Sequence, residues 1–92
     1  MDAERKRIEA EERNARHKRE KPFRTKIAEI EKKIEVLEKE KTAIEDAMYE
    51  PDYYSDTTRA KTHVERLGAI KSQLEKLVYE WAQKNEEMEK MG

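Results

Sequence analysis

Two segments of this chain repeat large side chains at alternating intervals of three and four residues, and this repeat limits what the chain can fold into. The first repeat contains Phe23, Ile27, Ile30, Ile34, Leu37, Lys41, Ile44 and Met48. The second contains Ala60, His63, Leu67, Ile70, Leu74, Leu77, Trp81, Lys84, Met88 and Met91. An average interval of about 3.5 residues puts every member on one stripe of an α-helix, which is the seam of a coiled coil. We expect Val64 and Val78 to widen the second stripe.

The stretch between the two repeats predicts a loop at residues 49–56. Pro51 cannot continue a helix, and Ser55 or Asp56 can cap the next helix by accepting hydrogen bonds from its first amides. Because a short connection makes successive helices antiparallel neighbours, residues 22–92 are predicted to form an antiparallel coiled-coil hairpin with this loop as its tip. The fold class is therefore all-α.

Folding about this loop predicts which seam residues face each other across the hairpin. The predicted neighbours are Met48 with Ala60, Leu37 with Ile70, Ile34 with Leu74, Ile27 with Trp81, and Lys41 with Leu67 and Gly68. The same apolar seam can also pair between two chains, which gives a dimer or bundle. The position of the loop favours the hairpin, so we expect a monomeric domain.

Residues 1–21 are predicted to add an N-terminal helical segment to the hairpin. Their composition favours a helix, but Ile8 is their only large aliphatic residue beyond Met1, so they lack an apolar stripe. Pro22 has no amide hydrogen and disfavours the helical conformation at Lys21. We therefore expect a break, a kink or a new helix start at Pro22.

The overall composition excludes several classes of protein. With 92 residues, 47% charged and 35% hydrophobic, the chain has too little apolar material for the broad core of a three-layer α/β enzyme. No stretch approaches the roughly 20 apolar residues that cross a bilayer, and the charged first 21 residues do not resemble a signal peptide. The lack of cysteine fits a cytoplasmic location.

The sequence predicts no catalytic site, no metal site and no cofactor within this domain. His17 and His63 are far apart and have no further ligands at metal-binding spacing. Ser55, Asp56 and His63 are the residue types of a hydrolase triad, but helix capping explains the first two. The two glycines do not form a phosphate-binding loop.

Positive charge is concentrated near the N-terminus, where residues 1–26 carry ten Lys or Arg against six Asp or Glu. The candidate nucleic-acid-binding residues are Arg13, Arg16, Lys18, Arg19, Lys21, Arg24 and Lys26. Closely spaced cations of this kind neutralise the phosphates of DNA or RNA. Phe23 is the only aromatic residue nearby, so we expect contact with the phosphate backbone. The alternative is a solvated helix face whose charges pair with Glu86, Glu87 and Glu89.

Aromatic residues form a second feature, at the predicted tip. Tyr49, Tyr53 and Tyr54 either pack over the last turn of the seam or form a contact surface for a partner, because tyrosine is enriched in interfaces. Trp81 lies in the second repeat, where we expect it to anchor the seam.

Several motifs resemble the C-terminal coiled-coil domain of ABC-F ATPases, the tandem-cassette proteins that include the Uup type. They are residues 22–27 (Pro-Phe-Arg-Thr-Lys-Ile), residues 50–56 (Glu-Pro-Asp-Tyr-Tyr-Ser-Asp), and residues 77–81 (Leu-Val-Tyr-Glu-Trp) followed by residues 86–88 (Glu-Glu-Met). The resemblance covers nearly the whole chain. The long, mixed-charge segment 1–21 departs from some relatives.

The resemblance implies a parent protein with two upstream ATP-binding cassettes, in which ATP and magnesium bind outside this domain. Residues 1–21 would then link the hairpin to the ATPase domains. In Uup-like proteins the C-terminal domain is associated with DNA, whereas the wider family acts on ribosomes, so the implied partner is DNA or ribosomal RNA. The alternative function is a structural coiled-coil module that positions the ATPase domains or a protein partner without binding nucleic acid.

Overall fold

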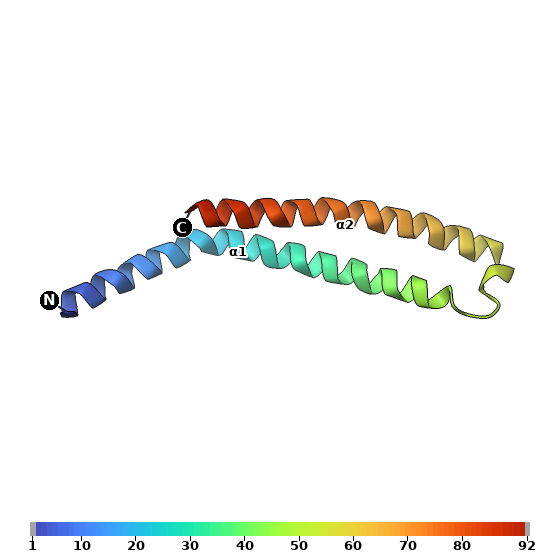
Figure 1. Ribbon diagram of the computed structural model, residues 1–92, viewed down its shortest axis with the longest axis horizontal. Coiled ribbons are helices and arrows are strands. Elements are labelled where there is room, and N and C mark those ends of the chain that lie inside the picture. The colour runs from blue at the N-terminus through green and yellow to red at the C-terminus, as the bar shows by residue number, and fades with distance from the viewer. Residues whose placement is uncertain (1, 92) are drawn as a thin grey trace.

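The computed structural model describes residues 2–91 as two long helices and a short connection. The elements are helix α1 (Asp2–Ala47), the 3-10 turn η1 (Tyr53–Ser55) and helix α2 (Thr57–Met91). Figure 1 shows α1 and α2 side by side in opposite directions, with the N-terminal part of α1 projecting past the end of α2. The molecule measures 77 × 20 × 13 Å, so it is a rod one helix layer thick. The predicted all-α helical hairpin is confirmed.

The core is the single seam between the two helices. Ile27, Ile30 and Ile44 of α1 are buried against α2, where Ile70 is fully buried. The rest of the seam is mostly half-buried, because no third layer of structure covers it. The expectation for Val64 and Val78 is wrong, since they are 62% and 52% exposed. At about 100° per residue, these two valines lie roughly 80° to 120° around α2 from Ile70, which turns them away from α1.

Trp81 lies at the edge of the seam and is less buried than its predicted role as an anchor requires. It is 39% exposed. Its indole Nε1–H donates a hydrogen bond to Glu31 Oε1 of α1 at 2.9 Å. The indole therefore joins the two helices partly through a polar contact at the surface.

Helix α1 is continuous through Pro22. The predicted break or new helix start is therefore not found, because the helix runs from Asp2 to Ala47 with Pro22 inside it. Figure 1 shows that the light-blue stretch of α1 bends, which agrees with the remaining expected outcome, a kink. A proline inside a helix removes one backbone hydrogen bond and bends the axis, and helix-forming residues on both sides can still continue the helix.

The connection at residues 48–56 is ordered by local hydrogen bonds. At its start the Met48 amide donates to the Ile44 carbonyl at 3.1 Å. At its end Asp56 Oδ1 accepts a hydrogen bond from the Arg59 amide at 2.9 Å, which caps α2 as predicted. Ser55 belongs to η1 instead.

One charged pair bridges the helices between the tip and the middle of the hairpin. Arg66 donates from Nε to Glu40 Oε1 at 2.9 Å and from Nη2 to Glu40 Oε2 at 2.6 Å. This two-bond arrangement matches the planar guanidinium to the planar carboxylate. The hydrogen bonds from Arg66 lower the pKa of Glu40, and those same bonds raise the pKa of Arg66. The pair therefore favours one register of α1 against α2.

Candidate nucleic-acid interface

The seven predicted binding residues lie in one stretch of α1, residues 13–26, which we call the basic stretch. All seven are exposed to solvent. They are Arg13, Arg16, Lys18, Arg19, Lys21, Arg24 and Lys26. The stretch begins in the part of α1 that projects beyond α2 and continues to the base of the hairpin (Figure 1).

Two of these seven cations already have an acidic partner on α1. Arg24 forms an ion pair with Glu20, whose side chain is buried. Lys26 lies 3.8 Å from Glu29, in an exposed pair that contributes little to stability. The other five, Arg13, Arg16, Lys18, Arg19 and Lys21, make no ion pair within residues 2–91. These five charges are available to an external anion.

The acidic residues near the end of α2 do not neutralise the basic stretch. Glu86 pairs with Lys90 at 3.2 Å, and Glu87 pairs with Lys84 at 3.3 Å, both within α2. Glu89 is exposed and makes no ion pair within the described residues. The alternative in which these three glutamates balance the basic stretch is therefore wrong.

Glu20 is a residue of this region that the sequence reasoning missed. It is 8% exposed, the only buried charged residue among those described. Its position in the sequence predicts burial, because Glu20, Phe23 and Ile27 continue the alternating spacing of the seam toward the N-terminus. Arg24 compensates the buried carboxylate, so Arg24 has a structural role that the other cations lack.

The three tip tyrosines separate into two roles. Tyr53 is 1% exposed, its hydroxyl is hydrogen-bonded to His63 Nδ1 at 3.0 Å, and the two rings stack with centroids 5.6 Å apart. The Arg59 guanidinium lies 5.5 Å from the centre of the Tyr53 ring, as in a cation–π contact. Tyr49 and Tyr54 are 86% and 73% exposed. Tyr53 therefore packs onto the seam, while Tyr49 and Tyr54 face solvent.

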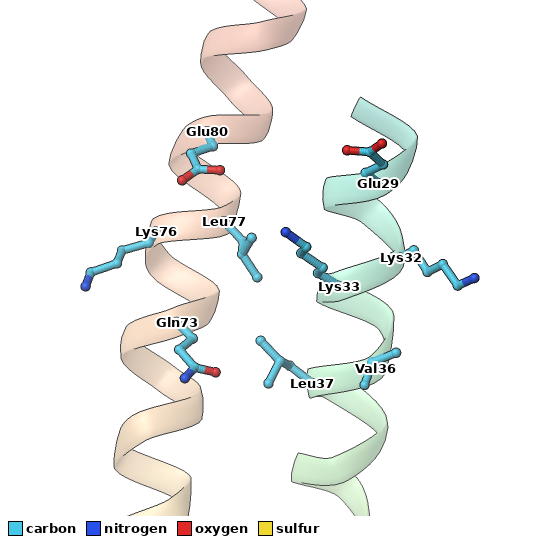
Figure 2. Close-up of a pocket in the computed structure, with 9 residues that line it drawn as sticks. All are labelled: Glu29, Lys32, Lys33, Val36, Leu37, Gln73, Lys76, Leu77 and Glu80. Carbon is cyan, nitrogen blue, oxygen red and sulfur yellow. The ribbon is translucent and has the colours of Figure 1, made fainter. Parts of the chain in front are cut away.

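An open groove runs along one face in the middle of the hairpin, away from both the basic stretch and the tip. Figure 2 shows Lys33 and Leu37 of α1 and Leu77 of α2 reaching into the space between the helices, with Lys32 and Lys76 directed outward. The groove exists because no third element covers the seam between α1 and α2. Its rim carries charges of both signs, as on the solvated face of a coiled coil.

Within residues 2–91, no three His, Cys, Asp or Glu side chains come together as a group that could hold a metal ion. Neither described helix is long and apolar enough to cross a membrane.

Comparison with known proteins identifies the family. Residues 18–89 match the family model of the ABC transporter C-terminal domain. The match includes both helices of the hairpin, the tip and most of the basic stretch. Searches of curated proteins and of solved structures gave no match. Because the family model covers most of the chain, this chain belongs to the ABC transporter C-terminal domain family.

Proposed function

We propose that this domain is a non-catalytic, nucleic-acid-binding C-terminal domain of an ABC-F type ATPase. The observation that supports it best is that five of the seven exposed cations in the basic stretch have no ion-pair partner within residues 2–91. Cations arranged along one helix bind a phosphate backbone by releasing its condensed counterions. In this proposal the hairpin acts as a rigid support for the basic stretch.

The proposal places the chemistry of ATP hydrolysis in other parts of the parent protein. ATP and magnesium would bind to upstream ATP-binding cassettes in a cytoplasmic protein. The first 21 residues would connect those cassettes to the hairpin. DNA, or ribosomal RNA in a translation role, would be the partner of the basic stretch.

The dependence of binding on salt tests this function. Fluorescence anisotropy of labelled DNA and structured RNA, titrated with the monomeric domain at several salt concentrations, gives the slope of log K against log salt. Five phosphate contacts predict a slope of about −4.5 for duplex DNA, so we expect tight binding at low salt and strong weakening toward physiological salt. If neither nucleic acid binds at low salt, the proposal is wrong.

A second candidate function is a structural interaction module that contacts protein through its tip. It is favoured by the exposure of Tyr49 and Tyr54, two aromatic side chains on an ordered connection. Tyrosine supplies a large contact area with little conformational entropy to lose.

The tip function predicts a different response to substitution. Tyr49→Ala with Tyr54→Ala should change the free energy of unfolding by less than about 0.5 kcal/mol, because both side chains are exposed. Under this function the double variant loses association with the parent's ATP-binding cassettes in calorimetry, and variants of the basic stretch retain it. If the tip variant retains this association and variants of the basic stretch lose it, the tip is not the contact surface.

A further inference from the structure

Helix α2 carries a second stripe of residues, which α1 does not cover. Its members recur at alternating intervals of four and three residues, so they share one flank of the helix. We call them the outer stripe: Val64, Gly68, Lys71, Glu75, Val78 and Ala82. All six are exposed to solvent, and the two valines are 62% and 52% exposed. The spacing that forms the hairpin seam is therefore repeated on a flank of α2 that has no partner within residues 2–91.

Gly68 lies in an open groove beside the outer stripe. A glycine inside a helix is unfavourable relative to alanine, because it loses more backbone freedom on folding. The hairpin gives no steric reason for this glycine, since a Cβ atom at Gly68 would meet no atom within 4 Å. Leu67 and Leu74 line the same groove and are only half-buried. A position without a side chain, next to exposed apolar surface, lets the backbone of another helix approach closely.

The charges of the outer stripe match a second copy of the same stripe that runs in the opposite direction. Lys71 and Glu75 are exposed at its centre, and neither makes an ion pair within the described residues. A two-fold axis beside Gln73 relates residue 71 of one chain to residue 75 of the other. Each lysine then faces a glutamate of the second copy, and the symmetry produces this pair twice.

The same register also matches the apolar and small residues. It sets Val64 opposite Ala82 of the second copy. It also sets Gly68 opposite Val78, so that the missing side chain makes room for a valine. A shift of one heptad in either direction would instead place a glutamate opposite Val64. A parallel pairing would set Lys71 against Lys71. The antiparallel register about Gln73 is therefore the favoured one.

We propose that the outer stripe is an isologous interface through which two copies of this domain pair in antiparallel orientation. This surface is distinct from the hairpin seam, which stays within one chain, and the inference does not rest on the proposed function. The contact is about 27 Å long and about 10 Å wide, which is less than the roughly 800 Å² per partner of a standard interface. Association is therefore weak and reversible, with a dissociation constant on the order of 100 µM, and the domain is monomeric at low micromolar concentration.

Sedimentation equilibrium of the whole chain, from about 10 µM to about 1 mM, tests the pairing. We expect an average mass close to 11.0 kDa at the lowest concentration and a rise toward twice that value at the highest. Gly68→Gln should weaken association about tenfold or more, because its side chain fills the space that Val78 of the second copy needs. The variant should keep the hairpin, since glutamine favours a helix and a Cβ atom there meets no neighbour. Circular dichroism checks that the helices are retained.

Exchange of charges tests the register. Lys71→Glu and Glu75→Lys each place like charges opposite one another, so each variant alone should associate about tenfold or more weakly. An equal mixture of the two variants restores opposite charges at both positions, and its association should return to within a few-fold of that of the unsubstituted domain. The chain has no cysteine, so a mixture of Val64→Cys and Ala82→Cys should form a disulfide between the two variants in preference to either variant with itself.

Three results would overturn the pairing. One is a mass that stays at the monomer value at the highest concentration. Another is association that survives in both charge variants, or that their mixture does not restore, because the contact then lies elsewhere. The third is a domain that stays monomeric while Val78→Glu weakens its binding to the parent's ATP-binding cassettes, because the outer stripe then serves a different partner.

Discussion

Ile70→Ala is expected to lower the free energy of unfolding by about 2 to 5 kcal/mol. Ile70 is 0% exposed and sits at the centre of a seam that no second layer supports. Removal of its branched side chain leaves a cavity opposite α1, with the loss of both transfer free energy and packing. Small domains are stable by only about 5 to 15 kcal/mol, so this single change removes a large share of the stability. Urea unfolding followed by far-ultraviolet circular dichroism measures the free energy of unfolding of the variant and of the unsubstituted domain.

Val64→Ala is the matched control on the same helix. Val64 is 62% exposed, so we expect a change within about 0.5 kcal/mol. Equal losses in the two variants would contradict the position of the seam. The unfolding midpoint should also be independent of protein concentration, because a seam within one chain, unlike one between chains, does not depend on association.

Neutralisation of the five unpaired cations in the basic stretch is expected to weaken binding to duplex DNA about a thousandfold or more near physiological salt. The variant replaces Arg13, Arg16, Lys18, Arg19 and Lys21 with Gln. Each lost phosphate contact reduces the salt slope by about 0.9. Arg24 is retained because its removal would leave Glu20 buried without a counter-charge. Anisotropy titrations at several salt concentrations measure the affinity and the slope.

A variant with the same change in net charge elsewhere is the control. It replaces Lys32, Lys33, Lys61, Lys71 and Lys76, all exposed, with Gln. Charges beyond the contact are screened over about 8 to 10 Å, so we expect only a few-fold loss of affinity and an almost unchanged salt slope. A loss as large as that of the basic-stretch variant would show that net charge, and not these five positions, determines binding.

The fold could be predicted from the sequence because a coiled-coil seam is a local, periodic signal. The alternating spacing around Ile30 and Ile70 is enough to specify two helices, and Pro51 marks the place where the chain reverses. The width of each apolar stripe was predicted less well. Val64 and Val78 are apolar but turned away from α1, because a hairpin with one partner per helix buries only a narrow stripe.

The other differences between the sequence predictions and the structure arise where competing interactions decide the outcome, which residue spacing alone does not show. Pro22 disfavours a helix locally, yet the helix-forming residues around it keep α1 continuous. Glu20 was read only as a charge, although the seam spacing assigned it a buried position next to Arg24. The contact between Tyr53 and His63 joins the tip to α2, and no sequence rule gives the ring orientation that this contact requires.

The candidate site could be located from the sequence but not divided into its parts. Charge density alone identified residues 13–26, since seven cations lie there against Glu20. The pairing of Arg24 and Lys26, and the internal pairing of Glu86 and Glu87 on α2, depend on how the helices are placed. The structure was needed to distinguish cations already neutralised from those that remain available.

The contacts across the hairpin also imply an order of folding. Tyr53 and His63 are 10 residues apart in the chain, Glu40 and Arg66 are 26 apart, and Glu31 and Trp81 are 50 apart. Since the entropy lost on closing a loop grows with its length, the tip is expected to close first and the helices to zip together toward the base. Unzipping runs in the reverse direction. The base, where the basic stretch lies, is thus the end of the hairpin that opens most readily under load.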